Sequence, residues 1–285
     1  MEPEFNASKF KSSDRESYNL VAEKWDLYGS KTSGPFVGKL LELAGVKPGQ
    51  RAIEVCCGTG VGSRGAALLV GTSGYVLGTD LTPGMVDVAR ARAQSSGLPQ
   101  VEFRVMDCEA LDVPDHSFDA AVALYPHFSN YRQALAELLR VLHPGGRVSI
   151  GVGGGGPGGQ PSVAHQLIRE IVTRYQPEDP GGYPPNWAGP DPFSGLQRAL
   201  AEAGFTDLVT ALERRAIALT GPEESWEIGS MILSPVRHRL TMLEPALQDA
   251  ARQEFLAAFA PLANAETLTL RLGAVYVGGQ KPSVD

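Results

Sequence analysis

The sequence predicts an α/β fold with a doubly wound, mostly parallel sheet of seven strands and with helical cap elements. Short apolar segments alternate with segments of helical length, which is the pattern of parallel strands joined by crossover helices. The apolar segments are continuous runs, as expected for parallel strands that are buried on both faces. We expect one domain over residues 1–285, because this length suffices for one large domain.

The core of the domain is expected over residues 49–152. Strands are predicted at 50–55, 74–80, 101–106, 118–124 and 147–152, and helices at 61–70, 83–96 and 131–142. Pro83 in the first turn and Gly97 beyond the end delimit the second helix. The third helix is amphipathic, since one face carries Leu135, Leu138, Leu139 and Leu142. A turn at 143–146 is expected to separate that helix from the fifth strand.

Cap elements are expected on both sides of this core. Residues 1–48 form the predicted N-terminal helical cap, with helical spacing at 17–26 and a helix at 35–44. Residues 153–285 are expected to supply substrate-side lid helices and the last strands. Their helices are predicted at 162–175, 193–203 and over most of 223–259, and their strands at 206–219 and 268–278.

Two features of this C-terminal part bear on a substrate pocket. The glycine-rich run at 153–159 predicts a flexible loop that could serve as the hinge of a lid. Large apolar residues follow it, and we expect most of them in the core and some around an apolar pocket. They are Tyr175, Tyr183, Trp187, Phe193, Trp226, Met231 and Met242.

Composition narrows the class of partner. The formal net charge of -7, without any run of Lys or Arg, disfavours a nucleic-acid partner, because an acidic surface repels phosphates. No segment is long and apolar enough to cross a bilayer, and residues 1–17 lack the apolar core of a signal peptide. We therefore expect a cytoplasmic protein with a small-molecule substrate and no membrane partner. The oligomeric state is open.

The three cysteines predict neither a disulfide framework nor a metal site. Their number is odd, and Cys56 and Cys57 are adjacent, without the two-residue gap of a zinc knuckle. With Cys108, they are expected to be small buried residues without chemistry of their own. No metal is predicted.

The segment 53–62 is the first motif that carries chemistry. It is a glycine-rich turn between a strand and a helix, where the backbone can approach a ligand closely and the helix presents free N–H groups. A dinucleotide-binding turn would have its third glycine at position 63, but that residue is Ser63. The pattern therefore disfavours an NAD-type oxidoreductase and favours a ligand without a pyrophosphate.

Asp80 is the second motif. It ends the second predicted strand, twenty residues after Gly60, where a carboxylate can accept hydrogen bonds from both ribose hydroxyls of a nucleoside. The ordinary alternative is a helix N-cap before Pro83. A ribose-binding acid without a phosphate-binding turn points to an adenosyl sulfonium, and S-adenosyl-L-methionine (SAM) is the expected cofactor.

These motifs resemble those of the class I SAM-dependent methyltransferases, especially the group similar to the ubiquinone/menaquinone C-methyltransferases. The resemblance spans about residues 15–280 and is most specific in the segments 54–60, 71–85, 106–110, 117–119 and 139–147. It implies a Rossmann-like methyltransferase sheet and a small-molecule substrate. Cys56 stands where the family has its first motif glycine, so the turn there is expected to differ slightly.

The resemblance also implies a set of cofactor-binding residues. Asp80 would bind ribose, Asp107 the adenine amine, and Glu54 the turn or the amino group of the methionyl part. Asp107 could instead be a simple turn residue, and Glu54 an acid at the surface. The full set is Tyr18, Tyr28, Glu54, Cys57, Gly58, Thr59, Gly60, Asp80, Leu81, Met85, Asp107, Cys108 and Leu124, with both tyrosines the weaker candidates.

His127 is the candidate catalytic residue. It follows the fourth predicted strand, whose end would face the methyl group, and it could act as general base. The alternative is a loop histidine bonded to backbone, whereas His165 and His238 could line the substrate pocket. The expected function is SAM-dependent O- or C-methylation of an apolar or aromatic metabolite. The alternatives are a protein that binds SAM without methyl transfer and the disfavoured NAD-type oxidoreductase.

Overall fold

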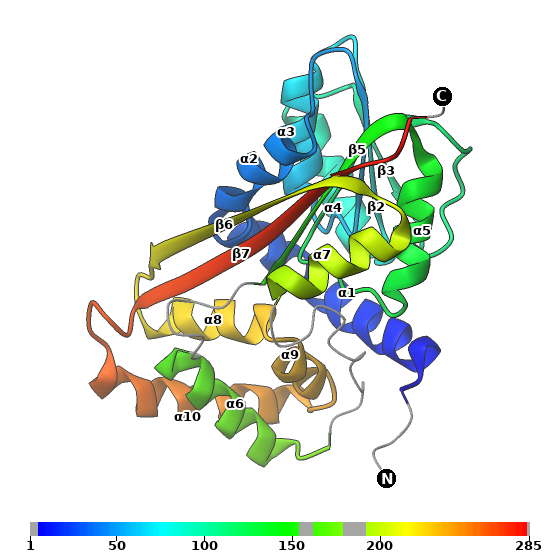
Figure 1. Cartoon of the computed structure of the whole chain (residues 1–285). Coiled ribbons are helices and arrows are strands. Elements are labelled where there is room, and N and C mark those ends of the chain that lie inside the picture. The colour runs from blue at the N-terminus through cyan, green and yellow to red at the C-terminus, as the bar shows by residue number, and fades with distance from the viewer. Residues whose placement is uncertain (1–4, 154–161, 179–191, 284–285) are drawn as a thin grey trace.

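The computed structural model describes residues 5–153, 162–178 and 192–283, and its centre is one seven-stranded sheet (Figure 1). The strand order is β3-β2-β1-β4-β5-β7-β6. The strands are β1 Arg51–Val55, β2 Tyr75–Asp80, β3 Val101–Val105, β4 Phe118–Leu124, β5 Leu142–Gly153, β6 Thr206–Ala218 and β7 Thr269–Gln280. β1 to β5 are parallel, while β7 runs antiparallel to β5 and to β6. The predicted fold class is confirmed.

Helices cover both faces of the sheet. One face packs against α2 (Gly34–Leu43) and α3 (Val61–Val70), whose apolar residues share a core with β1, β2 and β4. α5 (Tyr131–Val141) and α7 (Pro192–Ala203) cover the other face. α4 (Pro83–Ser95) lies beside β2 and β3. β1, β2 and β4 are therefore buried on both faces and mostly apolar, whereas the edge strand β3 exposes Glu102 and Arg104.

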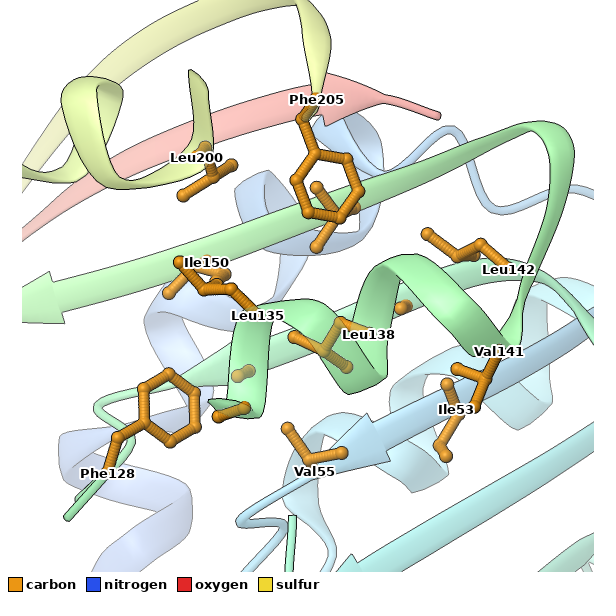
Figure 2. Close-up of a cluster of buried hydrophobic side chains, with 14 of the residues drawn as sticks. Ile53, Val55, Phe128, Leu135, Leu138, Val141, Leu142, Ile150, Leu200 and Phe205 are labelled. Atoms are coloured by element: carbon orange, nitrogen blue, oxygen red, sulfur yellow. The ribbon is translucent and has the colours of Figure 1, made fainter. Parts of the chain in front are cut away.

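The core beneath α5 confirms the apolar face predicted for that helix. Leu135 and Leu138 are fully buried and point toward the sheet, close to Ile53 and Val55 of β1 (Figure 2). Leu200 and Phe205 close this core from the side of α7. Burying one leucine or isoleucine contributes about 1.5–3 kcal/mol, so this cluster fixes the position of β1 and of the turn that follows it.

Two boundaries differ from the prediction. β5 begins at Leu142, so the turn expected at 143–146 lies within the strand. Its backbone is paired because the Gly145 N–H donates to the carbonyl of Lys281, and the Lys281 N–H donates to that of Gly146. α1 (Ala7–Thr32) starts well before residue 17, since Asn6 caps it through the Lys9 N–H and Phe10 is buried. The start of β5 thus depends on pairing with a segment far away in the sequence, whereas the start of α1 has a local cap.

The helices expected as a lid, here called the lid helices, form a further apolar cluster below the sheet (Figure 1). They are α6 (Val163–Tyr175), α8 (Pro222–Ile232), α9 (Ser234–Thr241) and α10 (Pro245–Phe259). The predicted helical region 223–259 is thus three helices, and a proline stands in the first turn of each. Trp226 is buried there, as predicted. Most of the run 153–159, together with Tyr183 and Trp187, lies outside the described residues.

Within those described ranges, no helix combines the length and the apolar character needed to span a membrane.

Candidate active site

A cavity of about 1020 Å³ opens at the carboxyl ends of β1, β2 and β4. The strand order reverses between β1 and β4, and open α/β sheets bind their ligands at such a switch point. α1, α6 and the segment from Ile232 to Leu233 wall it on the lid side, and β7 closes it near Leu270. Pockets for small molecules span roughly 300–1,000 Å³, so this one can hold a cofactor and an acceptor together.

Asp80 lies at the centre of this cavity wall. Its Oδ2 accepts a hydrogen bond from the Gly58 N–H at 2.8 Å, and its Oδ1 accepts one from the Thr82 N–H at 2.9 Å. Thr82, and not Asp80, is the N-cap residue of α4. Burial raises the pKa of Asp80 above its ordinary value, although both N–H groups act to lower it. Each oxygen keeps acceptor capacity for a ligand hydroxyl.

The glycine turn after β1 uses left-handed backbone. Gly60 has φ +77°, and a Cβ there would lie 2.6 Å from the Phe103 ring, so only glycine fits. Cys56 has φ +53°, which costs a residue with a Cβ roughly 1–2 kcal/mol. The turn therefore keeps a backbone conformation that favours glycine at the position where the family's glycine is replaced. The Cys56 thiol lies 3.8 Å from the Cys108 thiol.

Glu54 is buried, not at the surface, with 3% of its area exposed. Its Oε2 accepts a hydrogen bond from the Ser63 hydroxyl at 2.5 Å. Burial raises the pKa of Glu54 to about 7, against the lowering effect of Ser63. A Cβ on Gly62 would lie 2.1 Å from Glu54 Oε1, so the carboxyl packs directly on the first turn of α3. Ser63, whose presence disfavours a dinucleotide-binding motif, thus holds the Glu54 carboxyl in place.

Thr59 supplies a free hydroxyl beside the turn. Its Oγ1 is buried without a hydrogen-bond partner among the described residues, and Thr59 lines the cavity. A buried polar group without a partner costs about 1–3 kcal/mol. Together with the open acceptor sites of Asp80, this hydroxyl fits a ligand that carries several polar groups, as a nucleoside does.

Asp107 forms the local turn that was one of its two expected roles, and it also lines the cavity. Its Oδ1 accepts the Glu109 N–H at 2.9 Å, which is a local turn, and its Oδ2 pairs with Lys11 Nζ at 2.7 Å. Lys11 also pairs with Glu109 at 2.6 Å. Asp107, Glu109 and Lys11 all line the cavity, with Leu81 and Met85 nearby in its wall.

Most of the remaining predicted cofactor residues meet at the same cavity. Cys57, Gly58, Cys108 and Leu124 line it, and so does Tyr18 of α1. Tyr28 and Gly60 do not: Tyr28 lies near Glu224 and Glu227 of α8, and Gly60 faces Phe103.

Trp25 contributes to the wall of the turn as well as packing on its own helix. It lines the cavity, and its ring lies against Gly58, where a Cβ would be 3.5 Å from the indole nitrogen. The ring also makes an edge contact with Tyr18 at 5.1 Å between centroids. An aromatic wall beside the turn suits a flat or cationic ligand.

His127 pairs with a carboxylate, and not with backbone. Its Nδ1 lies 3.0 Å from Oδ2 of Asp14 in α1. The other oxygen of Asp14 faces His238 Nε2 at 3.0 Å and Arg237 Nη2 at 3.1 Å. Burial would raise the pKa of Asp14, but the charges and hydrogen bonds of these three partners outweigh it and hold that pKa far below its ordinary value.

Many apolar residues line the cavity from the ends of β4 and β5, from the helices below the sheet and from β7. They are Leu124, Tyr125, Val152, Val163, Ile232, Leu233, Leu270 and Leu272, and the polar Glu266, Thr267, Thr269 and Arg271 accompany them. His165 lines it too, and burial lowers its pKa to about 4, so the ring is neutral there. His238 is buried instead against Asp14. This wall suits an apolar or aromatic molecule.

Comparison with known proteins gives the class of this fold. Residues 52–146 match the family described as Methyltransferase domain. A putative methyltransferase from Bacillus halodurans C-125 has a similar structure, with TM-score 0.57 and 20% identity over 87% of this chain and 100% of that chain. Phosphoethanolamine N-methyltransferase 2 of Haemonchus contortus, in complex with S-adenosyl-L-methionine, gives TM-score 0.51 and 20% identity over 87% and 52%. Residues 52–146 thus match a methyltransferase domain, and the described chain has the Rossmann-like fold of these solved structures.

The sequence adds a more particular likeness. The chain is 34% identical over 142 residues to the ubiquinone/menaquinone biosynthesis C-methyltransferase of Ectopseudomonas mendocina (strain ymp). The match covers 47% of this chain and 56% of the relative, so the chain spans about half the length of the curated relatives it matches. The resemblance that the motifs indicated is confirmed.

Proposed function

We propose that the protein catalyses SAM-dependent methyl transfer to a small apolar or aromatic acceptor, by O- or C-methylation. One observation carries the proposal: the anchored Asp80, the unpaired Thr59 hydroxyl and His127 all border a single cavity with an apolar far wall. The matched methyltransferase domain and the cofactor of the Haemonchus enzyme support it.

In this proposal the near half of the cavity holds SAM. Asp80 accepts the ribose hydroxyls, Glu54 orients the turn or meets the amino group, and Asp107 with Cys108 lies at the adenine. Tyr18 and Trp25 of α1 close the site from the lid side. SAM supplies a methyl group that its sulfonium has already activated. The chain contributes positioning, exclusion of water and a proton acceptor.

His127 is the proposed proton acceptor. It follows β4 and lines the same cavity as Asp80. A general base contributes typically 10²–10⁴-fold to a rate, and it is needed when the nucleophile is a hydroxyl or an acidic carbon. We further propose that the substrate is a small molecule and not a nucleic acid, that the protein has no membrane partner and that it acts in the cytoplasm. The net negative charge supports the exclusion of nucleic acid, and the cysteine usage supports the cytoplasm.

Binding and turnover test this function separately. Calorimetry should show SAM and S-adenosylhomocysteine binding at micromolar concentrations or below, and a screen of phenols, quinols and β-diketones with methyl-labelled SAM should yield labelled product. Binding of NAD without SAM would contradict the proposal. SAM binding without transfer to any acceptor in a broad screen would favour the alternative in which SAM is bound but not used for methylation.

A further inference from the structure

We propose that Asp14 is the positioning residue of His127: it fixes the imidazole as the Nδ1–H tautomer, so that Nε2 can take the acceptor's proton. Asp14 lies in α1, 113 residues before His127, and its Oδ2 is 3.0 Å from Nδ1 of His127. The inference rests on the proposed function, and it adds a residue that no local motif indicates.

The tautomer follows from the charge of Asp14. An ionised carboxylate only accepts hydrogen bonds, so the ring nitrogen that faces it must carry the hydrogen. The low pKa of Asp14 keeps it ionised, because Arg237 and both histidines surround it. In a neutral His127 ring, Nε2 is then the nitrogen with a free lone pair.

The same contacts orient the free nitrogen. Asp14 covers the Nδ1 edge of the ring, and the Tyr18 ring lies beside it at 5.6 Å between centroids. The His127 side chain is still 34% exposed, and the residue lines the cavity. No described residue makes a hydrogen bond with Nε2, so this nitrogen is available to a molecule in the cavity.

The two carboxylate oxygens of Asp14 have different partners. Oδ2 serves His127, while Oδ1 is bound by Arg237 and His238, both 1% exposed and both in α9. Arg237 also donates to Ser17 Oγ at 2.9 Å and to the Met231 carbonyl at 2.7 Å. Its guanidinium lies 3.7 Å from the centre of the Tyr18 ring. Asp14 is thus immobilised on the side away from the base.

The proposed step transfers one proton. As the bond between the acceptor oxygen and the methyl carbon forms, the acceptor's O–H bond breaks and its proton passes to His127 Nε2. The methyl–sulfur bond breaks with its electron pair left on sulfur. The resulting imidazolium keeps its Nδ1–H against the Asp14 carboxylate, which stabilises the positive charge. For C-methylation, an enolic hydroxyl gives up the proton.

Nitrogen NMR of the intact protein tests the tautomer directly. Long-range ¹H–¹⁵N spectra distinguish the two neutral forms of each imidazole, and a spectrum of His127→Gln assigns the signals. We expect the Nδ1–H form for His127 in the wild type, above the pH at which the ring is protonated. The Nε2–H form would overturn the inference, and this measurement needs no Asp14 variant to fold.

A double-mutant cycle tests whether Asp14 acts through His127. Asp14→Asn should lower kcat about 100-fold, while the SAM dissociation constant stays within about twofold of wild type. In the His127→Gln background, the same change should have almost no further effect on kcat, because the base is already absent. Equal losses in both backgrounds would show a merely structural role.

Asp26→Asn is the matched control for this cycle. Asp26 is also in α1, is 8% exposed like Asp14, and pairs with Arg92, but it does not line the cavity. This variant should lose stability without the loss in kcat. If the wild type fails to bind SAM, the proposed function fails. A wrong tautomer or an additive cycle with intact SAM binding refutes the role of Asp14 alone.

Discussion

At the scale of the residue, Asp80 shows how a carboxylate can serve the chain and a ligand together. It holds the glycine turn through Gly58 and the start of α4 through Thr82, yet it borders the cavity. The backbone bonds fix both oxygens in place before a ligand arrives. A nucleoside bound there would meet preorganised acceptors. Little conformational entropy of the Asp80 side chain would then be lost on binding.

Asp80→Ala should weaken SAM binding about 100-fold. The change removes hydrogen bonds to a charged group, worth about 1.5–3 kcal/mol each, and 1.4 kcal/mol corresponds to a tenfold change in affinity. Calorimetry with SAM measures it, and Asp87→Ala is the control, because Asp87 lies in α4 with its side chain 71% exposed. An affinity within threefold of wild type would remove Asp80 from the cofactor site.

Glu54 predicts a pH dependence of stability. Its pKa is about 7 in the folded protein and near 4.5 in an unfolded chain, so the folded state binds the extra proton. The free energy of unfolding should therefore fall as the pH rises from about 4.5 to about 7, by an amount on the order of 3 kcal/mol. Urea unfolding of the ligand-free protein at several pH values measures this fall.

Glu54→Gln should remove that fall, because glutamine resembles the protonated acid and can still accept from Ser63. Glu102→Gln is the control, since the hydrogen bond from Arg104 holds the pKa of Glu102 below its ordinary value. It should leave the fall in place. Parallel curves for wild type and Glu54→Gln would show that Glu54 does not titrate in this range.

At the scale of the element, the contact between α1 and α9 links the two ends of the domain. Arg237 is the centre of this contact, with bonds to Asp14, Ser17 and the Met231 carbonyl. α1 bears Tyr18 and Trp25, which line the cavity. The docking of α9 on α1 thus positions these two rings together with Asp14, the partner of His127.

Arg237→Met should lower the free energy of unfolding by about 3 kcal/mol. Removing one partner from a buried ion pair typically costs 3–5 kcal/mol, because the other charge remains buried. Urea unfolding followed by tryptophan fluorescence measures the loss. Arg174→Met is the control: Arg174 is 63% exposed and pairs with Glu254 at the surface, so we expect less than about 1 kcal/mol there. Similar losses in both variants would contradict a central role for Arg237.

The elements of the core could be predicted from the sequence because their signals are local. Val61–Val70 has the predicted bounds because it lies between Gly60 and Gly71, and Phe118–Leu124 has them because it is a continuous apolar run. Asp80 could be identified by its spacing from the glycine turn. Lys11, Asp14 and Arg237 could not, because their partners depend on how α1 docks against loops and helices more than ninety residues away. No sequence pattern encodes that docking.

At the scale of the whole molecule, the cavity lies between two separately packed units. The sheet and its helices hold the glycine turn and Asp80, whereas the lid helices have their own apolar cluster around Phe255 and Phe259. α1 bridges them, since it contacts α4 of the core as well as α8 and α9 of the lid. A ligand that fills the cofactor half should therefore act on both units through α1.

S-adenosylhomocysteine alone should stabilise the turn and α1 together. At a hundred times its dissociation constant, a ligand of the folded state adds about 2.7 kcal/mol to the free energy of unfolding. Hydrogen–deuterium exchange can locate this effect, and we expect slower exchange in residues 56–62 and in the stretch of α1 from Tyr18 to Trp25. The surface end of α10 should change least, because α10 does not line the cavity. Protection confined to residues 56–62 would show that α1 does not close over the cofactor. In that case α1 could contact only the methyl acceptor.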